Sequence, residues 1–116
     1  MSKRLERIND EIAKTTAEII RSEMSDPRIA TVVSVTGAKT TADLKYCKIS
    51  VSVLEQNTHT PEAVMEALKS ATGFVRKRIA ETINLRHTPE ITFMLDDSIA
   101  YAMRMNRIMD ELVPKE

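Results

Sequence analysis

The segment Tyr46–Leu54 constrains the fold more than any other part of the sequence. Apolar residues occupy every second position in it, at Cys47, Ile49, Val51 and Val53, and the positions between them hold Tyr, Lys and Ser. Side chains alternate between the two faces of a strand, so one face here is apolar and the other is polar. The pattern predicts a strand in a sheet that is covered on one face only.

A helix with one apolar face is predicted before this strand, from Lys3 to about Met24. Its apolar stripe recurs at spacings of three and four residues, at Leu5, Ile8, Ile12, Thr16 and Ile19. Asp26-Pro27 ends the helix, because proline disfavours helical geometry in the residue before it.

Two more strands are expected. The β-branched run Thr31–Thr36 predicts a strand, and Gly37–Leu44 is interpreted as the connection to Tyr46, with some of it extending the strand. Two strands joined by so short a connection form an antiparallel hairpin. After Thr88-Pro89-Glu90, alternation over Ile91–Leu95 predicts the third strand.

Helices are predicted between the second and third strands and after the third. Thr60-Pro61-Glu62 supplies a hydroxyl N-cap, a proline at the first helical position and an early acid. Glycine is unfavourable inside a helix, so we expect a kink or junction at Ala71-Thr72-Gly73 and a second helix from Phe74 to about Asn84. Asp96-Asp97-Ser98 caps the last helix, which runs to about Leu112.

The predicted order is therefore α-β-β-α-α-β-α over one domain, residues 1–116. The two-helix crossover between the second and third strands favours parallel pairing of those strands. We expect an α+β domain with a three-stranded mixed sheet and its helices packed on one side. The length fits one domain, since typical domains hold roughly 100–150 residues.

Enzymatic chemistry has little support in the sequence. His59 and His87 have no partner at metal-ligand spacing, and only Gly37 and Gly73 are available for a phosphate loop. Cys47 lies on an apolar strand face and is interpreted as a small buried hydrophobe. We read Asp96-Asp97 as a helix cap and not as a cation site. No catalytic residue, metal or cofactor is predicted.

The distribution of charge is more informative than its total. Seventeen basic residues cancel seventeen acidic ones, yet between Lys69 and Pro89 five basic residues face only Glu81. A helix break there would expose backbone N–H groups that favour an anion, and Gly73 would let a phosphate approach. The alternative is that Gly73 permits close packing of helix on sheet. A basic stripe on the first helix is bordered by Glu11 and Glu18, which is also typical of a solvated face.

Other compositional features limit the partners and the compartment. Aromatic residues make up 3% of the chain, too few for reading single strands by base stacking, so recognition of RNA shape through phosphates and hydroxyls is favoured. A single cysteine, short apolar runs and an N-terminus without an apolar core predict a cytoplasmic protein that does not enter a membrane.

Several motifs in order resemble the bacterial ribosome-binding factor A family. They are Asp26-Pro27-Arg28-Ile29, the segment from Asp43 to Leu54, Ala71–Arg76, Asn84–Glu90 and Asp96-Asp97-Ser98, and together they cover about residues 3–112. The resemblance implies a type II KH-like domain in which Ala-x-Gly, here Ala71-Thr72-Gly73, replaces the Gly-x-x-Gly loop of nucleic-acid-binding KH domains.

The same resemblance implies a function and partners. Members assist late assembly of the 30S ribosomal subunit, including 5′-end processing of 16S rRNA, support growth in the cold and catalyse no reaction. They bind the immature particle near its neck and decoding region and leave with help from a ribosome-associated GTPase. Nothing in the sequence requires a dimer, so a monomer is expected.

We place the expected RNA-binding surface on the basic residues around the predicted kink. The stronger candidates are Lys69, Gly73, Arg76, Lys77, Arg78 and Arg86. The weaker candidates are Arg4, Arg7 and Lys14 of the first helix, with Lys45 and Lys48, near the second strand, expected to line the same groove.

Two other classes of function stay open at this point. A protein–protein adaptor would use the last helix, which carries Met103, Met105 and Met109, and burial of these methionines in the isolated protein would remove that idea. A small-molecule enzyme would need a deep pocket with convergent polar groups.

Overall fold

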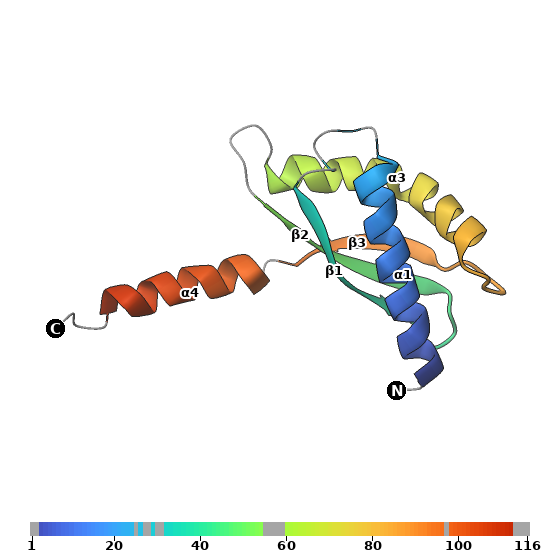
Figure 1. The fold of residues 1–116 in the computed structure, drawn as a ribbon, viewed down its shortest axis with the longest axis horizontal. Coiled ribbons are helices and arrows are strands. Elements are labelled where there is room, and N and C mark those ends of the chain that lie inside the picture. Colours follow the sequence, from blue (N-terminus) through green and yellow to red (C-terminus); the bar gives the residue numbers. More distant parts are fainter. Residues whose placement is uncertain are drawn as a thin grey trace.

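The structure is a computed structural model that describes residues 3–24, 26, 29, 32–54, 60–96 and 98–112 (Figure 1). In chain order its elements are α1 (Lys3–Ser22), β1 (Val33–Thr40), β2 (Tyr46–Val53), α3 (Pro61–Thr82), β3 (Glu90–Leu95) and α4 (Ser98–Leu112). The three predicted strands and the first and last helices are present within a few residues of their expected bounds. The predicted start of the first strand, Thr31, lies outside the described residues.

Strand β2 lies at the centre of the three-stranded sheet. It pairs antiparallel with β1 and parallel with β3, so Ile49 has Ala38 on one side and Phe93 on the other. The predicted hairpin, crossover and mixed sheet are confirmed. Strand β1 is longer than the β-branched run predicted, because a bulge between Val35 and Gly37 lets pairing with β2 continue to Thr40.

The turn between β1 and β2 is held by Asp43. Its Oδ1 accepts hydrogen bonds from Thr41 Oγ1 at 2.6 Å and from the Lys45 backbone N–H at 3.1 Å. These bonds, the Thr41 hydroxyl first, hold the pKa of the Asp43 carboxyl below its ordinary value. Leu44 takes a left-handed φ of 62° next to it. The turn fixes where Lys45 enters β2.

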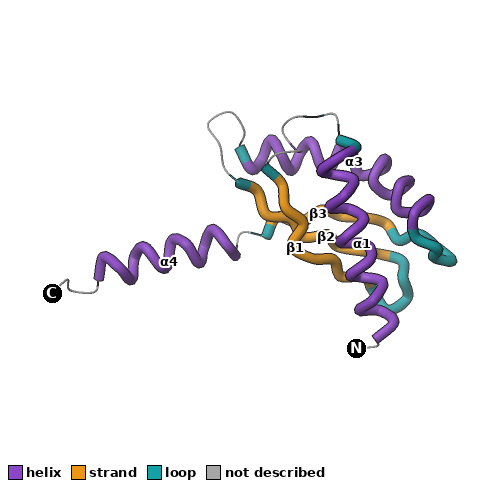
Figure 2. Tube along the Cα trace, in the orientation of Figure 1, coloured by secondary structure: helices purple, strands orange, loops and turns teal. Residues whose placement is uncertain are grey.

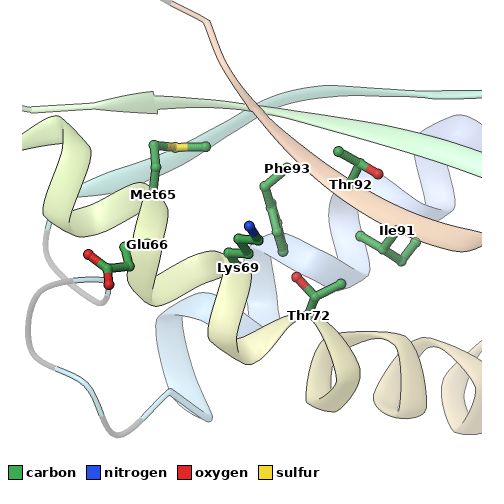
Figure 3. Close-up of a pocket in the computed structure, with 7 residues that line it drawn as sticks. All are labelled: Met65, Glu66, Lys69, Thr72, Ile91, Thr92 and Phe93. Carbon is green, nitrogen blue, oxygen red and sulfur yellow. The ribbon is translucent and has the colours of Figure 1, made fainter.

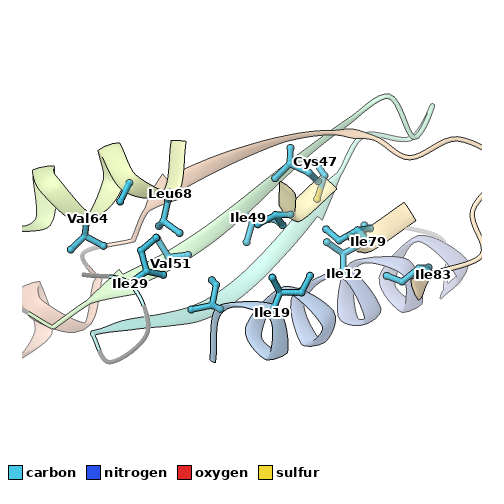
Figure 4. Close-up of a cluster of buried hydrophobic side chains, with 14 of the residues drawn as sticks. Ile12, Ile19, Ile29, Cys47, Ile49, Val51, Val64, Leu68, Ile79 and Ile83 are labelled. Atoms are coloured by element: carbon cyan, nitrogen blue, oxygen red, sulfur yellow. The ribbon is translucent and has the colours of Figure 1, made fainter. Parts of the chain in front are cut away.

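Helices α1 and α3 cover one face of the sheet and leave the other face open (Figure 2). The core between them is aliphatic, and the side chains of Ile12, Ile49 and Ile79 are fully buried within it (Figure 4). Cys47 belongs to this core with 1% of its surface exposed, and burial raises the pKa of its thiol. The interpretation of Cys47 as a buried hydrophobe is confirmed.

The predicted division into two helices is wrong, because α3 is one helix that runs through Ala71-Thr72-Gly73 without interruption. Its axis nevertheless changes direction near Thr72 (Figures 1 and 3), so the predicted kink is present as a bend within one helix. The Thr72 hydroxyl donates to the Leu68 carbonyl at 3.1 Å, a side-chain bond that competes with the helix ladder and bends helices. At its start, Thr60 Oγ1 accepts from the Ala63 N–H as the sequence predicts.

Helix α4 does not pack on the sheet, so the prediction that all helices share one side is wrong for this element. It extends away from the other elements (Figure 1), and its residues from Tyr101 to Leu112 are exposed. The Asp96 carboxylate accepts from the Ser98 N–H at 3.0 Å and caps the helix, and its bonds to Ser98 lower the pKa of Asp96. Asp97 lies outside the described residues.

We expect Ile49→Ala to lower the free energy of unfolding by about 2–5 kcal/mol, because it leaves a cavity between β2 and both helices. Leu54→Ala, directly after the same strand at a side chain that is 64% exposed, should change it by less than about 0.5 kcal/mol. Urea titration followed by circular dichroism measures both. Equal losses for the two variants would contradict the placement of the core.

The Asp43 carboxyl should contribute to stability in a pH-dependent way. Its folded pKa is lowered, so the contribution is present above the unfolded pKa of about 3.9 and is lost as the pH falls through the folded value. We therefore expect Asp43→Asn to lower the urea midpoint at pH 6 and to have a shrinking effect toward pH 3. A difference that persists undiminished at pH 3 would show that the carboxylate's bonds are not its cause.

Candidate nucleic-acid interface

One exposed side of α3 carries the basic residues predicted around the bend. Lys69, Gly73 and Arg76 follow each other at spacings of four and three, and Lys77 borders them, so all four share a side of the helix. All four are exposed. We call these four residues the α3 basic face.

Gly73 leaves open space at the centre of this face. A Cβ built on Gly73 meets nothing within 4 Å, so close packing on the sheet is not the reason for a glycine here. The expected anion site at exposed backbone N–H groups is also wrong, because an uninterrupted helix has no N-terminus at this point. What remains of the prediction is a stretch of helix backbone that a partner can approach.

A groove of about 550 Å³ runs between α3 and the edge strand β3, beside Lys69 (Figure 3). Its walls are formed by Met65, Glu66, Lys69, Thr72, Ile91, Thr92 and Phe93. Two of these residues are charged, the cation Lys69 and the carboxylate Glu66. The other lining side chains are apolar or carry a hydroxyl group. The groove therefore places a cation beside a mostly apolar wall.

Arg76 is committed to the protein's own backbone. Its Nη2 donates to the Thr88 carbonyl at 2.9 Å and its Nε donates to the Pro89 carbonyl at 3.2 Å. The side chain therefore ties the second half of α3 to the connection that leads into β3. Arg76 acts mainly as a clamp for this connection.

Arg78 is also engaged, on the opposite side of α3 from Lys69. Its Nε lies 2.7 Å from Glu23 Oε1 and its Nη1 lies 2.7 Å from Glu81 Oε2. The bond to Glu23, followed by that to Glu81, raises the pKa of the guanidinium. Two carboxylates already compensate this cation, so it offers little net charge to RNA.

The clamp lies at the end of the sheet where β2 and β3 both begin. A hollow of about 370 Å³ is lined by Lys45, Arg76, His87 and Thr88, together with Asp43, Leu44, Tyr46 and Glu90. The Glu90 N–H donates to the Lys45 carbonyl at 2.9 Å and holds the two segments side by side. Lys45 thus lies near Arg76 as expected. Sequence reasoning considered His87 only as a metal ligand and missed its place here, although it directly follows the exposed Arg86.

The remaining predicted residues lie elsewhere. Lys48 points to the open face of the sheet, since its neighbours Cys47 and Ile49 point into the core, so it does not line the groove beside Lys69. Arg4, Arg7 and Lys14 are exposed on α1, which packs over β1, whereas α3 packs over β3. The predicted set is therefore spread over more than one surface.

The structure also bears on the other classes of site. Within the described part of the chain, no group of three or more His, Cys, Asp or Glu side chains could hold a metal ion. Among the same residues, no helix has the length and apolar character needed to cross a membrane. Burial of the last helix's methionines would have removed an adaptor role for that helix. Met103, Met105 and Met109 are instead exposed, so the adaptor hypothesis stays open.

Comparison with known proteins identifies the family. A family model described as ribosome-binding factor A matches residues 4–109. The chain belongs to the ribosome-binding factor A family. It is 43% identical over 106 residues to ribosome-binding factor A of Clostridium beijerinckii, covering 91% of this chain and 90% of that protein. Identity to the Lachnospira eligens member is 45% over 106 residues, covering 91% and 81%.

Solved structures of the family share the fold. An NMR structure of a Thermotoga maritima protein assigned to the family matches with a TM-score of 0.68 and 31% identity over 81% of this chain and 88% of that one. The Thermus thermophilus crystal structure matches with a TM-score of 0.68 and 19% identity over 78% and 93%. A homology model of the Thermus protein, fitted into a cryo-EM map of its complex with the 30S subunit, matches with a TM-score of 0.63 and 19% identity over 77% and 91%. The α+β fold and KH-like element order are confirmed.

We expect Arg76→Met to lower the free energy of unfolding by about 1–2 kcal/mol, because it leaves the Thr88 and Pro89 carbonyls without their donors. The neighbouring Lys77→Met should change it by less than about 0.5 kcal/mol, because that side chain is exposed. Urea unfolding of both variants measures the difference. Matching effects would mean that Arg76 is not a clamp.

Proposed function

We propose that this chain binds the 30S ribosomal subunit while the particle is immature and assists late maturation of 16S rRNA, including its 5′ end, without catalysing a reaction. The observation that carries the proposal is the α3 basic face, with its exposed Lys69 and Lys77, in a chain whose net charge is zero. Membership of the ribosome-binding factor A family and the 30S complex of the Thermus relative support it.

The basic surface favours contact with phosphates over reading of bases. Lysine side chains attract phosphate without sequence information, and few aromatic side chains are available for stacking. The groove beside Lys69 and the hollow beside Lys45 are each lined by residues of α3 and of β3, so together they offer a path along α3. A path of this kind suits the shape of a folded RNA.

Assistance without catalysis needs a difference in affinity between two states of the subunit. A binder shifts a conformational equilibrium only by the ratio of its affinities for the two conformations. The proposal therefore requires tighter binding to immature than to mature subunits. Release aided by a ribosome-associated GTPase and action in the cytoplasm belong to the same proposal and rest on the family resemblance.

The test is co-sedimentation of the full chain with purified immature and mature 30S subunits at several salt concentrations. If roughly four to six phosphates are neutralised, log affinity should fall with log salt at a slope of about −3 to −5. Lys69→Gln with Lys77→Gln should weaken binding and make the slope shallower by about 2. These lysines have no role in the clamp, unlike Arg76, so folding should be retained.

A matched control removes the same charge elsewhere. Lys39→Gln with Arg107→Gln changes two exposed cations, on β1 and on α4, that are not on the α3 basic face. This variant should bind like the wild type. Equal loss in both double variants would assign binding to net charge and not to the named face.

Two other outcomes would change the proposal. Loss of binding only in Arg7→Gln with Lys14→Gln would move the surface to α1. A wild-type chain that binds neither kind of subunit, or binds both equally and without salt dependence, would overturn the proposed function.

A further inference from the structure

The outer edge of β3 has no strand beside it. The strand order is β1-β2-β3, so β3 is paired on one side only. The N–H groups of Glu90 and Asp96 donate to carbonyls of the β2 segment at 2.9 and 2.7 Å. Main-chain groups alternate between the two edges of a strand, so the N–H and C=O groups of Ile91, Phe93 and Leu95 face away from β2. Among the described residues, these outward groups have no hydrogen-bond partner.

The opposite edge of the sheet is protected, in contrast. Strand β1 has a bulge between Val35 and Gly37, and Asn9 of α1 accepts a hydrogen bond from the Thr40 N–H at 2.8 Å. A bulge and a helix that covers edge groups both prevent a further strand from adding to a sheet. Strand β3 pairs with β2 in regular register along its length and has neither feature in the described part of the chain. The β3 edge is therefore the one that can accept another strand.

The groove of about 550 Å³ between α3 and β3 opens onto this edge. Ile91, Thr92 and Phe93 all line it, although consecutive side chains of a strand point to opposite faces, so the groove reaches the main chain on the outer side of β3. Met65 of α3 contributes to the facing wall (Figure 3). Leu95, further along β3, is 45% exposed. The edge thus combines unpaired main-chain groups with an apolar surface.

Lys69 determines the charge that this groove favours. Its side chain extends from α3 toward Phe93, whereas the Glu66 carboxylate points away from the strand (Figure 3). Lys69 makes no ion pair among the described residues. An ammonium group that is not compensated and lies beside an apolar wall attracts an acidic side chain.

We infer that β3 accepts an extended segment of another protein as an additional strand at its free edge. The segment has apolar residues at alternate positions, which face Met65 and Phe93, and an Asp or Glu that reaches Lys69. Ile91 and Leu95 lie about 13 Å apart at roughly 3.3 Å per residue, so about five residues of the segment pair with β3. A polypeptide, unlike RNA, supplies main-chain donors and acceptors at the repeat that the edge presents.

A phage library of random short peptides, panned on the full chain, supplies the probe. Selected sequences should have apolar residues at alternate positions and an Asp or Glu. A synthetic peptide of such a sequence should bind with a Kd of about 1–100 μM. In hydrogen exchange followed by NMR, it should slow exchange of the Phe93 and Leu95 amides, which are unpaired in the free protein. The amides of Thr92 and Met94 already face β2 and should change little.

N-methylation of the peptide tests the main-chain bonds without altering the protein. Only every second residue of an added strand directs its N–H toward β3. Methylation of that alternate set of amides should weaken binding about tenfold or more, because it removes donors from the ladder. Methylation of the other alternate set is the matched control and should have little effect.

Two lysine variants test the predicted charge contact. Lys69→Gln should weaken peptide binding by roughly three- to tenfold. Lys77→Gln is the matched control, since Lys77 is exposed on the same helix but does not line the groove. It should bind the peptide like the wild type. Replacing the acid of the peptide by its amide should abolish the difference between the wild type and Lys69→Gln.

Three results would overturn the inference. One is a library that yields no peptide with a Kd below about 1 mM. Another is a selected peptide that leaves the Phe93 amide unprotected, or whose two methylated forms bind equally. The third is a single-stranded RNA oligonucleotide that displaces the peptide and itself protects the Phe93 amide, which would assign the groove to nucleic acid. The inference goes beyond the proposed function, and its test contains no ribosomal subunit, so either can fail without the other.

Discussion

The parallel pairing of β2 with β3 is the constraint on which the rest of the structure depends. Parallel neighbours cannot be joined by a tight turn, so the chain must return across the sheet through a crossover, and α3 is that crossover. Since β2 is also paired with β1, its apolar side chains are enclosed only if α1 and α3 lie on the same face. The consequence is a two-layer domain with one open sheet face and with α3 along the β3 edge, where the groove forms.

The cations of α3 have different physical tasks. Arg78 is neutralised by two carboxylates and joins α3 to the residue that follows α1, whereas Arg76 joins α3 to the connection before β3. Lys69 and Lys77 make no such ion pair or hydrogen bond among the described contacts, and both side chains are exposed to solvent. A surface cation attracts a partner only to the extent that its charge is not already compensated. The lysines, more than the arginines, therefore define the surface that RNA would meet.

Helix α4 stands apart from this two-layer arrangement. The sheet face that α1 and α3 leave open is mostly polar, with Lys48 and Ser50 on β2, so it offers little apolar surface to a following helix. The apolar side chains of α4, such as Tyr101, Ile108 and Leu112, are therefore left exposed. The domain and α4 are thus two surfaces of different chemistry, one basic and one apolar, joined by the short connection at Asp96.

The sequence by itself determined the elements, the mixed sheet, the buried Cys47 and the family, because alternation, helical periodicity, caps and ordered motifs are local signals. It predicted a kink or a junction at Ala71-Thr72-Gly73. The structure has the kink without the junction, since burial of Val75 and Ile79 keeps the second half in the same helix and Thr72 only bends it. The pairing of Arg78 with Glu81 is local, three residues apart on one helix, but its pairing with Glu23 was decided by tertiary structure. Glu23 and Arg78 lie far apart in the chain, and no spacing rule brings them together. Tertiary structure also decided that α4 is exposed, because an amphipathic helix has the same sequence pattern whether or not its apolar side packs on its own domain.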